Sequence, residues 1–205
     1  MTDDDLQQYL NVSRETLDRL KLFADLLVKW NRRINLVSRN SQTDLWERHI
    51  ADSIHVFRAA PAAGHWVDLG SGGGFPGMIV AILAADVSLD TKVTMIESDQ
   101  RKAAFLRAAA RETGVTCNVI SDRIELVAPQ QADVLSARAL ADLSDLLEHA
   151  DRHLIPGGVA LFPKGVTWQK EVDEAQRRWC FEVEAIKSLT KLGAAILKIT
   201  GVSRV

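Results

Sequence analysis

The chain has 205 residues, enough for one domain of ordinary size with a small appendage. Hydrophobic residues make up 47% and charged residues 25%, which excludes a disordered or fibrous chain and is typical of a globular protein. The net charge of −2 excludes a uniformly basic nucleic-acid-binding protein, so any surface that binds RNA has to be local.

Features that would place the chain in a membrane or outside the cell are not found. There is no apolar run of about 18 residues and no apolar segment behind the acidic N-terminus. We therefore expect a cytoplasmic protein with no membrane partner. Cys117 and Cys180 lack metal-site spacing, and His149 and His153, four residues apart, have no third ligand nearby, so we expect exposed histidines and no metal.

Residues 1–60 carry the periodicity of helices. Leu17, Leu20, Ala24 and Leu27 form one apolar stripe, and Ser13 is a plausible N-cap before it. No Pro- or Ser-rich linker follows. We therefore expect an N-terminal helical extension, residues 1–60, packed on a core domain, residues 61–205.

The second half of this extension is locally basic. Such a cluster can neutralise RNA phosphates, but taken alone it favours a solvated helix face. Between positions 29 and 48, five basic residues stand against two acidic ones: Lys29, Arg32, Arg33, Arg39 and Arg48 against Asp44 and Glu47.

A further helix is expected after this basic cluster. Ser41 and Asp44 have the spacing of a capping box. His49 and Asp52, three residues apart, lie on one face of that helix, and this face is expected to look toward the edge of the sheet. His49 is therefore a candidate for positioning a substrate.

The most informative stretch reads as a strand, a glycine-rich turn and a helix. Trp66 to Leu69 is strand-like, and Pro76 suits the first turn of the apolar helix that follows. Gly70, Gly72 and Gly74 lie in the turn between them, and glycine accepts positive φ and a close ligand without steric cost. Free amides at the start of the helix favour a polar or negatively charged ligand.

Two ligands compete for this turn. Gly72-x-Gly74-x-x-Gly77, followed by the acidic Glu97, matches the dinucleotide pattern of NAD enzymes. The longer pattern Asp68-x-Gly70-x-Gly72-x-Gly74 resembles motif I of S-adenosylmethionine (SAM) methyltransferases, where an acid suits an ammonium and sulfonium ligand. In either case Glu97, at the end of the second strand, can bind ribose hydroxyls.

Polar residues end the later strands as well. We expect strands at 93–96, 115–120, 133–138 and 159–162, a helix at 168–179, and a terminal antiparallel pair that brings the count to seven. In a doubly wound sheet the carboxyl ends of the strands form the ligand crevice. Three sets of residues fall at those ends: Ile124 and Glu125, Arg138, and Lys164.

Several segments together resemble the family of bacterial 16S rRNA guanine-N7 methyltransferases G, also called the glucose-inhibited division protein B family. The resemblance covers nearly the whole chain. It rests on Lys29-Trp30-Asn31 with Ile34-Asn35-Leu36, Arg48-His49-Ile50-x-Asp52-Ser53, the stretch from Asp68 to Gly77, and Ser136 with Arg138-Ala139.

The resemblance implies an α/β fold of the class I SAM-dependent methyltransferase type, with a Rossmann-like seven-stranded sheet whose last strand is antiparallel. It implies SAM as cofactor, the small ribosomal subunit or its 16S rRNA as partner, and N7 of a guanine in the decoding region as methyl acceptor. We expect a monomer. The cofactor-binding residues would be Asp68, Gly70, Gly72, Gly74, Phe75, Glu97, Ile124, Glu125 and Arg138.

Guanine N7 carries no proton, so this reaction needs no general base, and none is identified. Arg138, Lys164 and His49 would position the base. Three alternatives stay open: a SAM methyltransferase for a small molecule or protein, an NAD-dependent oxidoreductase, and an RNA-binding protein without cofactor affinity.

Overall fold

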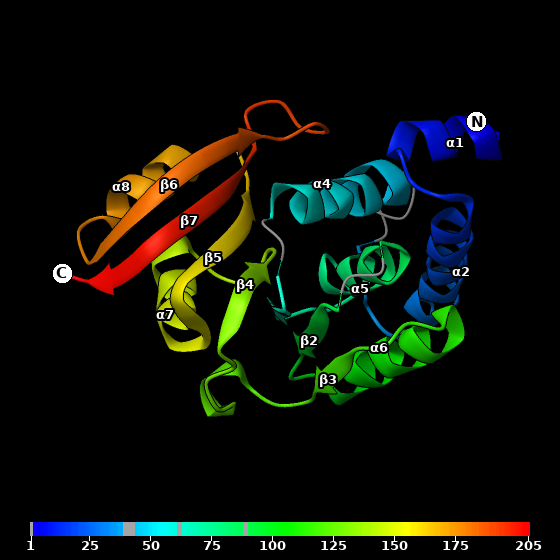
Figure 1. Ribbon diagram of the computed structural model, residues 1–205, viewed down its shortest axis with the longest axis horizontal. Helices are drawn as coiled ribbons and strands as arrows, with labels where there is room; N and C mark the ends of the chain where they lie inside the picture. Colours follow the sequence, from blue (N-terminus) through cyan, green and yellow to red (C-terminus); the bar gives the residue numbers. More distant parts are fainter. Residues whose placement is uncertain (1, 39–43, 61–62, 88–89) are drawn as a thin grey trace.

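A seven-stranded sheet forms the middle layer of the molecule (Figure 1). The structure is a computed structural model and describes residues 2–38, 44–60, 63–87 and 90–205. The strand order is β3-β2-β1-β4-β5-β7-β6. The strands are β1 (His65–Leu69), β2 (Lys92–Ile96), β3 (Asn118–Ile120), β4 (Ala132–Ala137), β5 (Leu154–Lys164), β6 (Trp179–Lys187) and β7 (Ala195–Arg204).

The strand directions bring one set of strand ends together. β1 pairs in parallel with β2 and β4, and β4 pairs in parallel with β5, whereas β7 is antiparallel to both β5 and β6. The seven-stranded sheet with an antiparallel last strand is therefore confirmed. The carboxyl ends of β1 to β5 meet at one edge, where open α/β sheets bind ligands.

Helices cover both faces of the sheet. α2, α4, α5 and α6 pack on one face, and α7 and α8 pack on the other. Alternate strand residues serve the two layers, because Trp66 belongs to the first core whereas Val67 and Leu69 belong to the second. The helices are α1 (Asp3–Leu10), α2 (Arg14–Asn31), the π-helix η1 (Leu45–Ala51), α4 (Asp52–Ala59), α5 (Gly77–Asp86), α6 (Gln100–Thr113), the 3-10 helix η2 (Ile124–Leu126), α7 (Leu143–His153) and α8 (Trp168–Ala175).

The N-terminal helices form as their sequence predicts. The Ser13 hydroxyl accepts a hydrogen bond from the backbone N–H of Thr16 at 3.1 Å and caps α2. The predicted apolar stripe is buried, and α2 lies against α5 and α6 (Figure 1). The capping box expected at Ser41, and Arg39 of the basic cluster, lie outside the described residues.

Four expectations about the C-terminal half are wrong. β3 begins at Asn118 rather than at position 115. β5 begins at Leu154 rather than at position 159, because Gly157, with φ of +81°, lets the chain continue through an irregular register with β4. α8 ends at Ala175, because the buried Trp179 already belongs to β6. His153 is fully buried rather than exposed.

Candidate functional site

The glycine turn joins β1 to α5 at the ligand-binding edge of the sheet. Gly70, Gly72 and Gly74 have φ angles of +61°, +54° and +89°, in the left-handed region that residues with a side chain rarely adopt. The backbone N–H of Ser71 donates to the Ile96 carbonyl at 3.2 Å, which ties the turn to β2. The turn thus depends on glycine for its backbone shape.

The side chain of Asp68, on β1, stabilises the glycine turn. One carboxylate oxygen accepts from the Ser136 hydroxyl at 2.7 Å, and the other accepts from the backbone N–H of Gly77 at 3.2 Å. The side chain has no exposed surface, and this burial raises the pKa of Asp68 to about 6. In this conformation Asp68 fixes the start of α5 and its distance from β4. Its predicted contact with a cofactor stays a prediction.

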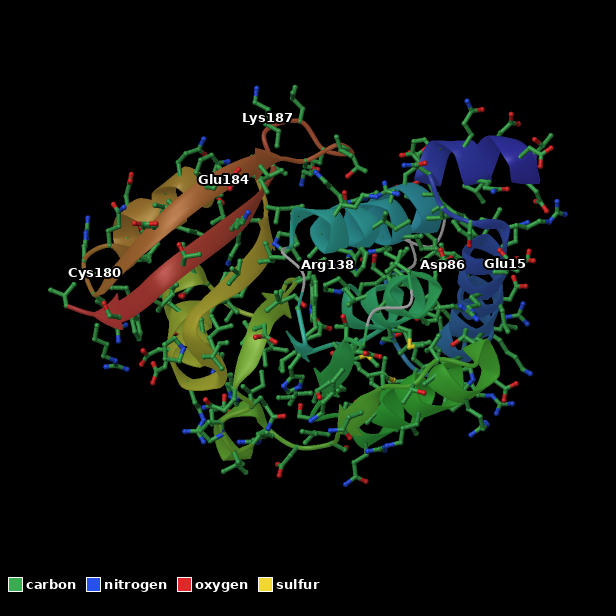
Figure 2. The ribbon with its side chains drawn as sticks, in the orientation of Figure 1. Glu15, Asp86, Arg138, Cys180, Glu184 and Lys187 are labelled. Carbon is green, nitrogen blue, oxygen red and sulfur yellow. The ribbon has the colours of Figure 1, made fainter. Side chains whose placement is uncertain are left out.

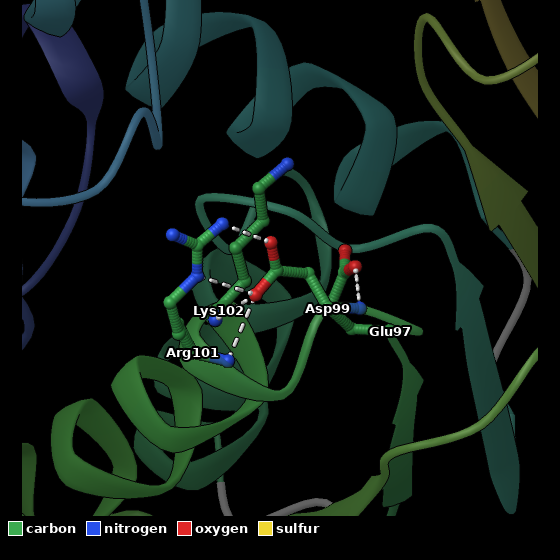
Figure 3. A network of polar contacts seen from close by, with 4 residues as sticks. All are labelled: Glu97, Asp99, Arg101 and Lys102. Atoms are coloured by element: carbon green, nitrogen blue, oxygen red, sulfur yellow. Dashed lines mark hydrogen bonds and ion pairs between the residues drawn. The ribbon is translucent and has the colours of Figure 1, made fainter.

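Glu97 holds the turn from the side of β2. Its carboxylate accepts from the backbone N–H of Gly72 and from that of Asp99, both at 2.8 Å. Asp99 in turn caps α6 and pairs with the guanidinium of Arg101 (Figure 3). Glu97 retains 7% exposure, so it differs from Asp68 in reaching the surface at the strand end where a ribose was predicted to bind.

The segment after β4, Arg138 to Ala141, crosses in front of the glycine turn. A Cβ atom on Gly70 would lie 2.7 Å from a terminal methyl of Leu140, so the Leu140 side chain covers the bare face of that glycine. Ala139 has a φ of +52°, which is strained for alanine. Arg138 and Ala139 line one cavity, whereas Leu140 and Ala141 line another. The segment therefore borders both cavities.

The first cavity, which we call the cationic pocket, has a volume of about 330 Å³. Its walls come from η1 and α4, from the ends of β4 and β5, and from the β6–β7 loop, so the N-terminal helices and the C-terminal hairpin meet here (Figure 2). Four cations outnumber one carboxylate among its lining residues: Arg48, Arg138, Lys164 and Lys191 against Asp52.

Two of the predicted site residues contact the ring of Phe75. The His49 ring stacks on Phe75 with centroids 5.0 Å apart, and the Arg138 guanidinium carbon lies 5.0 Å from the same ring. Arg138 also donates to the Arg48 carbonyl at 3.3 Å. Burial lowers the pKa of Arg138 to about 10, which leaves it protonated at neutral pH.

His49 differs from its cationic neighbours in charge. Burial, together with the positive charges of Arg138 and Arg48, lowers the pKa of His49 to about 4. The ring is therefore neutral at pH 7. Both ring nitrogens are buried and have no hydrogen-bond partner among the described residues. His49 can thus offer a neutral donor or acceptor to a ligand in the pocket.

Lys164 lines the same pocket but is already engaged. Its ammonium donates to the Ala141 carbonyl at 2.9 Å and pairs with the Glu171 carboxylate at 2.7 Å. Lys164 thereby links the end of β5 to the segment after β4 and to α8. Its direct contact with a substrate stays a prediction.

The second cavity, which we call the Ile124 groove, has a volume of about 430 Å³. Ile124 and Glu125, both predicted site residues, line it together with Leu140. Since Leu140 also covers Gly70, the groove lies beside the start of the glycine turn. Of the predicted site residues, Ile124 and Glu125 line the groove, and His49, Arg138 and Lys164 line the cationic pocket. The predicted residues of the glycine turn and Glu97 line neither cavity.

Sequence reasoning missed the contribution of the C-terminal hairpin. The Thr190 hydroxyl donates to the Asp52 carboxylate at 2.5 Å, across 138 positions of sequence, and Lys191 lines the pocket beside it. Leu140 was missed as well, although it lies two residues after Arg138. Only the fold brings these residues to the site. In the described part of the chain, no cluster of three or more His, Cys, Asp or Glu could hold a metal, and no helix is long and apolar enough to cross a membrane.

Known proteins resemble the chain in sequence and in fold. A ribosomal RNA small subunit methyltransferase G from Ruegeria pomeroyi is 63% identical over 196 residues and covers 96% of both chains. One from Cereibacter sphaeroides is 47% identical and covers 100% of both chains. Two solved structures share the fold. A methyltransferase from Geobacter sulfurreducens has a TM-score of 0.59 and 15% identity, and the match covers 98% of this chain and 97% of that one. A TehB-like SAM-dependent methyltransferase from Corynebacterium glutamicum has a TM-score of 0.59 and 14% identity, and the match covers 85% of this chain and 97% of that one.

The class I SAM-dependent methyltransferase fold is therefore confirmed. The model of the family described as rRNA small subunit methyltransferase G matches residues 16–200. Together with the relatives, this match shows that the chain belongs to the rRNA small subunit methyltransferase G family.

Proposed function

We propose that this protein transfers the methyl group of SAM to N7 of a guanine in the decoding region of 16S rRNA. Beyond family membership, one observation carries the proposal. The segment from Arg138 to Ala141 borders both the glycine turn with its groove and the cationic pocket, so a cofactor on one side and a base on the other would meet there.

The residues around the glycine turn fit SAM. The bare face of Gly70, now covered only by a flexible leucine, leaves room for a ligand to approach the backbone. Glu97 offers a carboxylate edge for ribose hydroxyls at the end of β2. Ile124 and Glu125 would contact the adenine, and Phe75 would bound the methionine end. Asp68 and Gly74 would act by holding the turn in shape.

Bound SAM would supply a methyl group on a positively charged sulfur. Guanine N7 attacks with its own lone pair, so the protein has no proton to remove and its task is alignment. The base becomes positive as the methyl arrives, and a cation beside N7 would oppose that change. Arg138 and Lys164 each have a hydrogen-bond partner in the fold, whereas the neutral His49 has none among the described residues. We assign His49 to the guanine edge.

The N-terminal extension, residues 1–60, would be part of the substrate site rather than a separate module. η1 and α4 supply Arg48, His49 and Asp52 to the pocket, while the core domain, residues 61–205, supplies the glycine turn. Arg32 and Arg33, which are exposed beyond α2, extend the positive surface for RNA phosphates. The protein would act as a monomer in the cytoplasm, where ribosomal subunits assemble.

The direct test is to map 7-methylguanosine in 16S rRNA from cells with and without this protein. We expect one modified guanine in the decoding region to disappear in the deletion strain and to return with the intact chain. A thermal-shift assay adds the cofactor, since SAM and S-adenosylhomocysteine should stabilise the protein and NAD should not. Stabilisation by NAD alone, or an unchanged modification map, would reject the proposal.

A further inference from the structure

The β6–β7 loop, residues 188–194, presents apolar side chains to solvent at the mouth of the cationic pocket. Leu192 is 98% exposed and Leu189 is 77% exposed. Val166, 57% exposed, lies beside them, since its side chain is within 3.2 Å of the Cβ position of Gly193. Single exposed leucines are common on protein surfaces, but an exposed apolar cluster at a site entrance indicates a contact surface.

This loop is held in place rather than free. The Ser188 N–H donates to the Ala194 carbonyl at 2.9 Å, and the Ser188 hydroxyl accepts from the Lys191 N–H at 3.1 Å. The Thr190 hydroxyl donates a hydrogen bond to the Asp52 carboxylate of α4. The loop therefore lies next to α4 (Figure 1). The leucines are therefore displayed by an ordered backbone.

Their position relative to the pocket is defined by their neighbours. Ser188, Thr190 and Lys191 line the pocket wall, so Leu189 and Leu192 lie at its rim. Exposed Lys187 lies at the base of the loop (Figure 2). Exposed Lys191 lies between the two leucines in the sequence. An apolar tip flanked by cations is complementary to RNA, in which apolar base faces lie between phosphates.

We propose that the β6–β7 loop is a wedge that enters the base stack of the rRNA beside the target guanine and fills the gap that this base leaves. The inference rests on the proposed rRNA methylation. A base cannot enter a pocket of this kind while it is stacked, and inserted apolar side chains are a known means of unstacking a base step. Leu192 and Leu189 provide the wedge, and Lys187 and Lys191 hold the adjoining phosphates.

The first experiment compares three substrates: small subunits from the deletion strain, protein-free 16S rRNA from those subunits, and an unstructured oligonucleotide with the target guanine. Leu192→Ala should lower kcat/KM about tenfold on both structured substrates and at most twofold on the oligonucleotide. Leu192→Met, which keeps an apolar side chain, should restore activity. Val205→Ala removes another highly exposed apolar side chain, at the far end of the hairpin, and should change nothing.

A second measurement does not depend on turnover. A synthetic rRNA hairpin carries 2-aminopurine next to the target guanine, and its fluorescence rises when that base loses its stacking partner. The wild-type protein with S-adenosylhomocysteine should raise the fluorescence, whereas Leu192→Ala should raise it less than half as much at saturating protein.

Several outcomes would overturn the wedge. One is an equal loss of activity on structured and unstructured substrates. A second is a loss on subunits alone, which would indicate a ribosomal protein as the partner of the loop. A third is no change in fluorescence with a wild-type protein that does methylate subunits. Failure of the wild type to methylate any RNA would instead reject the proposed function.

Discussion

The glycine turn and the cationic pocket lie side by side but are built in opposite ways. The turn is contiguous in sequence and owes its shape to backbone angles, with three glycines in the left-handed region. The pocket is assembled from four separate segments and owes its character to side chains, such as Arg48 on η1 and Lys191 in the β6–β7 loop. The first is therefore sensitive to added volume, and the second is sensitive to lost charge and lost hydrogen bonds.

The largest expected effect is on the turn. Gly74→Ala places a Cβ 2.7 Å from that of Met78 and 3.1 Å from the ring of Phe23, at a φ of +89°. Left-handed strain and overpacking together should lower the free energy of unfolding by about 2–5 kcal/mol. Urea unfolding monitored by circular dichroism measures the loss.

Gly157→Ala is the matched control for this change. Its φ is +81°, but nothing lies within 4 Å of its Cβ position, so only strain of about 1–2 kcal/mol should remain. Equal losses in the two variants would mean that the turn is not closely packed, which would break the contrast between the two regions.

The loss of a charge from the pocket should lower activity more than stability. Arg138→Ala removes the guanidinium over Phe75, and we expect kcat/KM for the RNA substrate to fall about 100-fold, equivalent to about 2.7 kcal/mol. Because Arg138 lines the pocket, SAM affinity by calorimetry should stay within about twofold.

Arg204→Ala serves as its control, because Arg204 stacks over Trp179 at 4.9 Å in the same manner but at the far end of the hairpin. A tenfold loss of SAM affinity in Arg138→Ala would move this residue to the cofactor side, and the two regions would then share it.

The same contrast explains what the sequence could predict. Glycine positions and strand ends are local signals, so the turn, Glu97, and the positions of Arg138 and Lys164 follow from pattern alone. The burial of Asp68 and the existing partners of Lys164 depend on neighbouring strands and helices that no local pattern describes. Thr190 reaches the site only because β7 folds back between β5 and β6.

A smaller effect should appear in the pH dependence of stability. The unfolded chain takes up a proton on His49 near pH 6.5, whereas the folded protein does so only near pH 4. Between these values the unfolded state binds more protons, so this group makes stability fall as the pH drops through that window.

His49→Phe keeps a ring to stack on Phe75 but removes the group that titrates. As the pH drops, the free energy of unfolding should then fall by about 1–2 kcal/mol less than in the wild type, which is below the value of the full pKa shift because the ring is partly exposed. Thermal unfolding of both proteins at pH 7, 6, 5 and 4 provides the measurement. Since His153 also has a pKa lowered to about 4 by burial, the variant should flatten the curve without abolishing it. Parallel curves would mean that His49 takes up its proton at the same pH in the folded and unfolded states.

The smallest expected effect concerns the hydrogen bond that joins the C-terminal hairpin to the N-terminal helices at the pocket. Thr190→Val keeps the shape of the side chain but removes the donor to Asp52, at a cost of about 1 kcal/mol, or roughly 2–4 °C in Tm. Burial already raises the pKa of Asp52, and the Thr190 bond opposes that rise, so the variant should raise the pKa further.

In Thr190→Val, hydrogen exchange should speed up in residues 188–194 and not in the strands. Thr200→Val, which removes a longer, exposed bond to Glu182 on the same hairpin, should leave the loop unchanged. Unchanged exchange in Thr190→Val would mean that the internal hydrogen bonds of the loop suffice to order it. The β6–β7 loop would then form its part of the pocket wall without help from the N-terminal helices.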